Sequence, residues 1–180
     1  KINKIIAVPN NEILNIIKKV YMNLSKKLII SKNIEEAETS KVIENIQRDL
    51  NIALMNEIYI FCEELNINFE NVYKLASTKW NFGKYRPGLV GGHCLPVDPY
   101  YFSYIAKKNN TKTSITLAGR NINEYMRKYI IKKIKLNLKK NGYNFKKDNI
   151  FFAGLTYKKN VSDLRNSQAF KIFSYFRSYN

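Results

Sequence analysis

The stretch from residue 34 to residue 65 contains neither Gly nor Pro, and it constrains the fold of this chain more than any other feature. Its apolar residues recur at spacings of three and four, which is the period of one face of an α-helix. These residues are Ile43, Ile46, Leu50, Leu54, Ile58, Phe61 and Leu65. The pattern predicts one long helix, or two helices that are nearly collinear.

Shorter periodic segments predict further helices on either side of this one. We expect a first helix that is capped by Asn10 or Asn11 and carries Ile13, Leu14, Ile17 and Val20. Further helices are expected over residues 69–76, 98–108, 113–140 and 166–179. The apolar runs Leu28–Ile30 and Asn149–Leu155 are typical of short buried strands. Residues 77–99 show no periodicity, and irregular segments of this length are usually functional or disordered.

The predicted fold is mostly α, with a central helical domain built on the long helix and a partial α/β piece on each side. The predicted domains are residues 1–32, 33–140 and 141–180. The predicted strand at 149–155 has no parallel partner in the sequence, and a single strand cannot satisfy its own backbone groups. We therefore expect the chain to be a fragment or a truncated product of a larger protein.

Composition restricts the function classes. The formal net charge is +17, but the lysines are spread among Asn and Ile instead of forming one basic stripe, so nucleic-acid binding is only a minor alternative. No apolar run reaches the length of a membrane span, and nothing at the N-terminus directs secretion. Two cysteines and one histidine make neither a disulfide framework nor a zinc site of usual spacing. We expect a cytoplasmic protein with no metal.

The loop from Pro87 to Tyr101 gathers three glycines, three prolines, the only histidine and one of the two cysteines. Cys94 has Asp98 four residues later at a predicted helix start, which suits a nucleophilic thiolate beside a carboxylate. A small buried cysteine in a Gly-rich turn fits equally well. For His93 a structural or substrate-edge role is favoured over a dyad with Cys94, because adjacent residues rarely face each other.

The long helix carries two further features. Cys62 lies among Ile58, Phe61 and Leu65, where a cysteine is usually an inert core residue. Lys41 and Asn45 are one turn apart on a polar stripe that also holds Glu38 and Arg48. A solvated helix face is the simpler interpretation of that stripe.

Five segments, taken together and in this order, resemble the nucleotide-sugar 6-dehydrogenases, the UDP-glucose dehydrogenase family. They are residues 37–45, 51–57, 87–101, 118–124 and 154–167. Thr78–Phe82 followed by Pro87–Cys94 is most similar to the bacterial branch that oxidises UDP-N-acetylglucosamine or UDP-N-acetylgalactosamine for surface polysaccharide synthesis. The resemblance implies Rossmann-like flanking domains, NAD as the cofactor, a UDP-sugar substrate, and a homodimer or higher homo-oligomer formed through the long helix.

The resemblance also implies roles for individual residues. Cys94 would hold the C6 aldehyde as a thiohemiacetal and then as a thioester, so that one alcohol loses two hydrides in turn. Lys41 and Asn45 would stabilise the oxyanion or hold the water, and Asp98 would assist proton transfer. Arg165 is implied on the cofactor side. The residues implied at the UDP-sugar are Lys158, Tyr157, Gly91, Gly92, Tyr85 and Arg86.

The sequence departs from the family in having no Gly-x-Gly-x-x-Gly unit. We therefore expect the parent protein to be an enzyme of the NAD-dependent alcohol oxidoreductase class and the isolated chain to be inactive. The alternatives are a non-catalytic helical dimerisation fragment and a dehydrogenase of UDP-glucose or UDP-N-acetylmannosamine.

Overall fold

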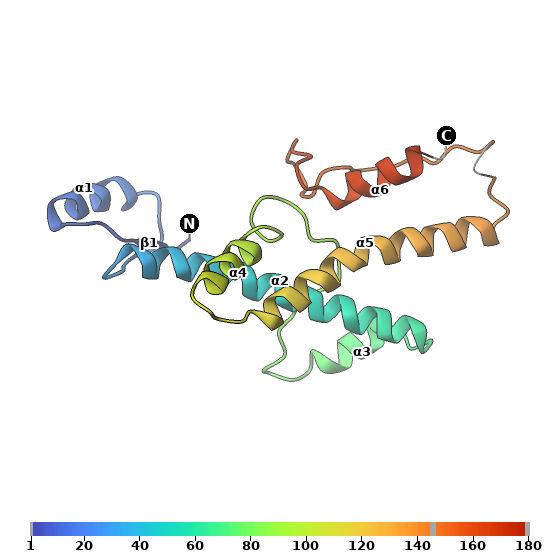
Figure 1. Cartoon of the computed structure of the whole chain (residues 1–180), viewed down its shortest axis with the longest axis horizontal. Coiled ribbons are helices and arrows are strands. Elements are labelled where there is room, and N and C mark those ends of the chain that lie inside the picture. Colours follow the sequence, from blue (N-terminus) through green and yellow to red (C-terminus); the bar gives the residue numbers. More distant parts are fainter. Residues whose placement is uncertain (1, 145–146, 179–180) are drawn as a thin grey trace. The chain divides into compact units, whose positions relative to one another are not determined.

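The computed structural model describes residues 2–144 and 147–178, which form a mostly helical chain (Figure 1). This confirms the predicted fold class. The elements are β1 (Lys4–Ile6), α1 (Asn11–Tyr21), β2 (Leu28–Ile30), α2 (Ile34–Glu64), α3 (Phe69–Ala76), α4 (Asp98–Lys108), α5 (Ser114–Lys140) and α6 (Gln168–Arg177). The contacts divide the chain into two units, one up to Glu44 and one from Asn45 onward. The three predicted domains remain a prediction.

The first unit contains a small β–α–β arrangement. Strand β1 pairs in parallel with β2, with Lys4 opposite Leu28 and Ile6 opposite Ile30. Between them α1 begins after Asn10, whose side-chain oxygen accepts a hydrogen bond from the backbone N–H of Ile13 at 2.9 Å. The predicted strand β2 is confirmed, whereas β1, which is equally short, was not predicted.

Helix α2 is one continuous helix and not two, and each end has a local reason. At its start the Asn33 side chain accepts a hydrogen bond from the backbone N–H of Glu36 at 2.8 Å. At its end Asn66 adopts the left-handed conformation, with φ of 56°. The backbone N–H groups of Asn66 and Ile67 then donate to the carbonyls of Glu63 and Cys62, which is the Schellman arrangement that ends many helices.

In the second unit α2 packs along α5. Contacts advance together along the two helices, from Asp49 with Arg120 to Tyr59 with Tyr129 and Glu63 with Lys133, so the helices run in the same direction. Gly119 permits the close approach, because a Cβ there would lie 2.4 Å from Leu50 Cδ2. The connection between them contains α3, the Gly- and Pro-rich loop and α4.

An aromatic cluster packs α3 against the C-terminal half of α2. Met55 and Cys62 of α2 are buried against Phe69 and Tyr73 of α3. The ring of Tyr73 also meets that of Phe82 edge-on at 5.6 Å. Cys62 is 2% exposed, as predicted for an inert core thiol.

The segment after α5 corrects one expectation. Residues 149–155 are not a strand, because within the described part of the chain no strand pairs with them. They pack instead as an extended segment, with the ring of Phe152 edge-on to Phe173 of α6 at 5.5 Å. Helix α6 begins later than predicted, after Ser167, whose hydroxyl accepts from the backbone N–H of Phe170. Residue 179, the predicted end, lies outside the described residues.

Candidate active site

The irregular loop before α4 is attached to the helices by a buried asparagine. Asn56 of α2 is 0% exposed, and its side-chain oxygen accepts from the backbone N–H of Gly88 at 2.7 Å. Its side-chain nitrogen donates to the carbonyl of Gly88 at 3.0 Å and to Asn123 Oδ1 of α5 at 2.8 Å. One amide therefore fixes the start of the loop to both long helices, a role that the sequence analysis did not assign.

Asn123, which binds the Asn56 amide, also binds a buried ion pair. Arg120 Nη1 of α5 donates to Asp49 Oδ1 of α2 at 2.6 Å, and both side chains are 1% exposed. The Asn123 side chain donates to the same carboxylate oxygen at 2.8 Å. Burial raises the pKa of Asp49, while the charge of Arg120 and these hydrogen bonds act in the opposite direction. Glu124 Oε1 accepts from the second guanidinium nitrogen at 2.8 Å, so Arg120 binds one carboxylate of each long helix.

Cys94 lies at the turn into α4 and is exposed. Its carbonyl accepts hydrogen bonds from the backbone N–H groups of Val97 at 3.0 Å and of Asp98 at 2.8 Å. Asp98 is the first residue of α4, and its Oδ2 accepts from the side-chain nitrogen of Asn45 at 2.6 Å. Asn45 is 2% exposed, so it does not belong to a solvated helix face. The structure thus brings together three predicted residues from two distant segments: Asn45, Cys94 and Asp98.

Lys41 belongs to the first contact unit. Its ammonium group is 2.5 Å from Glu44 Oε2, and its side chain is 60% exposed. The predicted role of Lys41 beside Cys94 remains a prediction from the resemblance.

The two adjacent glycines of the loop lie against the segment before α6. A Cβ on Gly91 would be 2.8 Å from the backbone oxygen of Asn166. Gly92 has a φ of +94°, and a Cβ there would be 2.8 Å from the ring of Tyr157. The Asn166 side chain donates to the carbonyl of Gly92 at 3.2 Å. Only glycine allows this close approach of backbone, and the predicted contact of both glycines with a sugar stays a prediction.

His93 joins the same contact, although the sequence analysis could not assign its partner. Its Nε2 is 2.6 Å from Asp163 Oδ2, and its ring stands edge-on to Tyr157 at 5.9 Å between centroids. Arg165 binds Asp163 through Nη2 at 2.9 Å and through Nε at 3.1 Å. These hydrogen bonds from Arg165 lower the pKa of Asp163 well below its usual range, with a smaller contribution from His93.

The other residues predicted at the UDP-sugar lie in two irregular segments, Tyr85 and Arg86 before α4 and Lys158 before α6. Arg86 binds both oxygens of Glu70 of α3, at 2.8 and 2.7 Å, and its guanidinium carbon is 3.7 Å from the ring centre of Tyr73. In this structure α3 therefore holds Arg86. Tyr85 is half-buried before it, and Lys158 is exposed next to Tyr157. No described contact joins these residues, and their substrate roles remain predictions.

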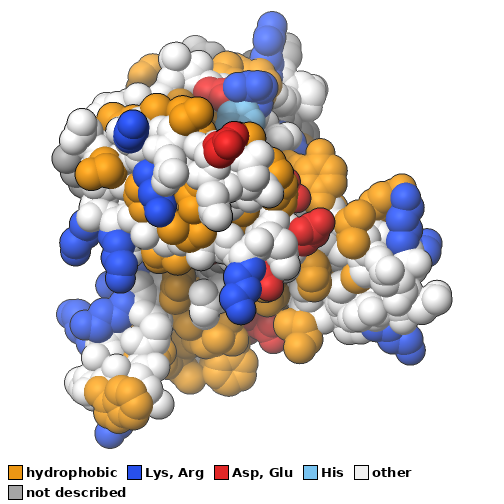
Figure 2. All heavy atoms as spheres, turned by 90° about the vertical axis from the view of Figure 1, so that its left-hand side faces the viewer, with side chains coloured by type: hydrophobic (Ala, Val, Ile, Leu, Met, Phe, Trp, Pro, Cys, Tyr) orange, Lys and Arg blue, Asp and Glu red, His pale blue; other side chains and the backbone are white. Residues whose placement is uncertain are grey.

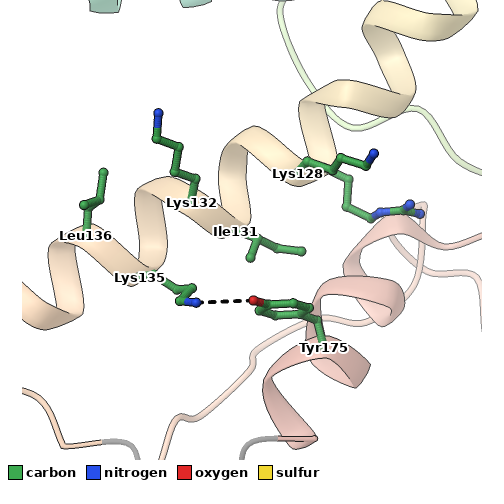
Figure 3. A pocket seen from close by; sticks show the side chains of 7 residues that line it. Lys128, Ile131, Lys132, Lys135, Leu136 and Tyr175 are labelled. Carbon is green, nitrogen blue, oxygen red and sulfur yellow. Dashed lines mark hydrogen bonds between the residues drawn. The ribbon is translucent and has the colours of Figure 1, made fainter.

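A separate cavity of about 590 Å³ lies between α5 and α6 (Figure 3). Its lining is apolar with basic side chains: Arg127, Lys128, Ile131, Lys132, Lys135, Leu136 and Tyr175. The ammonium group of Lys135 is 3.4 Å from the hydroxyl of Tyr175. None of the residues predicted for catalysis, substrate or cofactor lines it.

The basic side chains are dispersed on the surface that Figure 2 shows, where they stand singly or in small groups between apolar and uncharged ones. This distribution agrees with the even spread of lysines in the sequence. None of the helices in the described residues has the length and apolarity that crossing a membrane requires.

Comparison with known proteins identifies the family. The central domain of the UDP-glucose/GDP-mannose dehydrogenase family matches residues 35–125. Protein CapL of Staphylococcus aureus is 41% identical over 99% of this chain, which covers 42% of that protein. The UDP-N-acetyl-D-glucosamine 6-dehydrogenase of Pseudomonas aeruginosa is 44% identical over 82% of this chain and 35% of its own length.

A solved structure shows the same arrangement of elements. The UDP-D-ManNAc dehydrogenase of Pyrococcus horikoshii superposes with a TM-score of 0.82 at 31% identity, over 98% of this chain and 42% of its own. The chain thus spans about 42% of the length of this structure, as it does of CapL. With the family match, the relatives and the fold in agreement, the chain belongs to the UDP-glucose/GDP-mannose dehydrogenase family and contains its central domain.

Proposed function

We propose that the protein carrying this chain is an NAD-dependent UDP-N-acetylhexosamine 6-dehydrogenase, which oxidises the C6 alcohol of the sugar to a carboxylate for surface polysaccharide synthesis. The observation that carries the proposal is that the exposed Cys94 lies in the turn into α4, four residues before Asp98, whose carboxylate Asn45 binds at 2.6 Å. The proposal includes a homodimer or higher homo-oligomer and a cytoplasmic location.

The residues of the site suit a reaction that passes through a covalent thioester. The Cys94 thiol adds to the C6 aldehyde and gives a thiohemiacetal, which becomes a thioester when it loses a hydride and its hydroxyl proton. Water then attacks the thioester carbon, a carboxylate forms, and the thiol is released. The Asp98 carboxylate accepts the proton of that water, while Asn45 holds Asp98 in place. The cation of Lys41 suits the developing oxyanion.

The residues present fit the cofactor in part. NAD, when bound, accepts the hydride at each of the two oxidations. The side chain of Arg165 is 76% exposed while Asp163 fixes its orientation, and an exposed guanidinium suits a pyrophosphate. The parallel β1–β2 pair and α1 are α/β elements of the kind that dinucleotide-binding domains contain. Because the 180 residues include no Gly-x-Gly-x-x-Gly unit, we expect this chain alone to form no NADH.

We rank the candidate substrates by the sequence identity of this chain to relatives of named activity. Two UDP-N-acetyl-D-glucosamine 6-dehydrogenases, from Salmonella typhi and Pseudomonas aeruginosa, are 39% and 44% identical to this chain. The UDP-N-acetyl-D-mannosamine dehydrogenase of Campylobacter jejuni is 36% identical. We therefore place UDP-N-acetylglucosamine first. UDP-N-acetylgalactosamine and UDP-N-acetylmannosamine come next, followed by UDP-glucose.

The test is NADH formation by the full-length protein with each of these UDP-sugars. We expect two NADH per sugar consumed, and no carboxylate from a Cys94→Ser variant. Cys62→Ala is the control, since it removes the other cysteine of these 180 residues, which is buried in the core. Full turnover by Cys94→Ser would overturn the thioester mechanism. If no UDP-sugar gave NADH, the enzyme proposal would be overturned in favour of a non-catalytic helical dimerisation fragment.

A further inference from the structure

We infer that His93 is a positioning residue, which fixes the loop carrying Cys94 to the segment before α6 through Asp163. The inference deepens the proposed function and rests on it, because it assigns His93 a part in placing the proposed nucleophile. It answers the question that the sequence left open, namely why the only histidine of the chain stands directly before this cysteine.

The loop that precedes Cys94 is attached to the rest of the second unit at two places, Gly88 and Gly92–His93. At Gly88 the buried amide of Asn56 binds both backbone groups. At Gly92 and His93 the segment 157–166 supplies the hydrogen bond from Asn166 and the contact with Asp163. Cys94 follows immediately, and its carbonyl accepts the first hydrogen bonds of the turn into α4. The position of Cys94 is therefore set by the residue before it and by the helix after it.

In the contact between His93 and Asp163, the histidine is the hydrogen-bond donor. Asp163 accepts from the backbone N–H of Arg165 and from its guanidinium, so its carboxylate remains an acceptor. His93 must then donate, with the proton on Nε2, at a distance of 2.6 Å. The side chains of His93 and Asp163 are 41% and 19% exposed, so the pair is partly shielded from water. The glutamine amide nitrogen can take the place of Nε2 as donor, whereas alanine cannot.

A thiol that reacts with a bound aldehyde needs its sulfur in a narrow range of positions. Misplacement of a reacting group by about 1 Å can cost a factor of about 100 in rate, even when substrate binding is intact. Loss of the His93 contact weakens the second attachment of the loop, which then keeps only the hydrogen bond from Asn166 to Gly92. The expected effect is therefore on kcat more than on KM.

The experiment compares four variants of the full-length protein with the unmodified one: His93→Ala, His93→Gln, Asp163→Ala and the double variant His93→Ala/Asp163→Ala. We expect His93→Ala to lower kcat about tenfold or more, with the KM for the UDP-sugar changed less than about threefold. The double variant should be no slower than the slower single variant, because His93→Ala removes no contact with Asp163 that Asp163→Ala leaves in place. His93→Gln should recover most of the loss. Lys84→Ala, an exposed residue of the same loop, is the control and should leave kcat unchanged.

Hydrogen exchange of the loop amides, residues 88–97, separates failure of this inference from failure of the proposed function. We expect faster exchange in His93→Ala and Asp163→Ala than in His93→Gln. Unchanged kcat in His93→Ala, additive losses in the double variant, or no recovery in His93→Gln would each overturn the positioning role. Full turnover by Cys94→Ser would overturn the proposed thioester mechanism. His93 could then not be positioning a catalytic thiol, even if hydrogen exchange of the loop still depended on His93 and Asp163. The contact itself would stand as structural.

Discussion

At the scale of single residues, the most buried charges in the described part of the chain join two helices, whereas the proposed nucleophile Cys94 is exposed. Asp49 and Arg120 are 1% exposed and join α2 to α5. Asn123 and Asn56 extend this contact to Gly88, so the loop of Cys94 rests on a hydrogen-bonded network. Removing one charge of a buried pair leaves the other without compensation, which costs far more than losing a surface pair.

We predict that Arg120→Met lowers the free energy of unfolding by roughly 3–5 kcal/mol, because Asp49 is then buried without its partner. The control is Lys133→Ala, which breaks the ion pair of the same two helices at Glu63. Its side chains are 47% and 32% exposed, so its loss should cost below about 1 kcal/mol. Urea unfolding of both variants measures the difference. Equal costs would show that the pair of Asp49 and Arg120 is not the attachment inferred here.

At the scale of elements, the loop between α3 and α4 is shaped by what it touches. Gly91 and Gly92 lie against Asn166 and Tyr157, where a side chain has no space, whereas a Cβ on Gly88 would meet nothing within 4 Å. The glycines of one loop therefore differ in their tolerance of substitution. Close backbone approach, and not flexibility in general, is the reason at Gly91.

We predict that Gly91→Ala destabilises the protein by about 1–3 kcal/mol, because its Cβ would lie 2.8 Å from a backbone oxygen that cannot rotate away. The matched substitution Gly88→Ala should change stability by less than about 0.5 kcal/mol. Thermal or urea unfolding midpoints test the pair. A Gly91→Ala protein as stable as Gly88→Ala would mean that the segment before α6 does not lie against the loop.

At the scale of the whole molecule, α2 exposes more apolar surface than a solvated helix needs. Leu54 and Phe61, seven residues apart on α2, and Leu65, directly after its end, are 52%, 59% and 55% exposed. A second copy of the chain would cover such a face, in keeping with the predicted homo-oligomer.

We predict that Phe61→Glu in the full-length protein shifts the oligomer to smaller species, because the charge would be buried at the interface without a partner. Leu75→Glu, on α3 and 72% exposed, is the control and should leave the assembly unchanged. Light scattering after size exclusion measures the mass of both. An unaltered mass for Phe61→Glu would place the interface elsewhere.

The sequence by itself determined most of the local structure. Helices α3 and α4 have the predicted bounds, and α2 and α5 differ from theirs by a residue, because apolar periodicity and end signals act over one or two turns. The family motifs also marked Cys94, Asn45 and Asp98 before any contact between them was known. Residues 149–155 failed as a strand, since strand formation depends on a partner elsewhere and not on composition alone.

Only the tertiary structure decided which residues meet. Asn45 binds Asp98 across 53 residues, and His93 meets Asp163 across 70. No periodicity encodes such pairs, because they arise when helices and loops pack together. The same holds for Asn56, an unremarked polar residue of α2 that holds Gly88 in place. Local sequence therefore determined the elements and the candidate nucleophile, whereas long-range packing determined how that nucleophile is held.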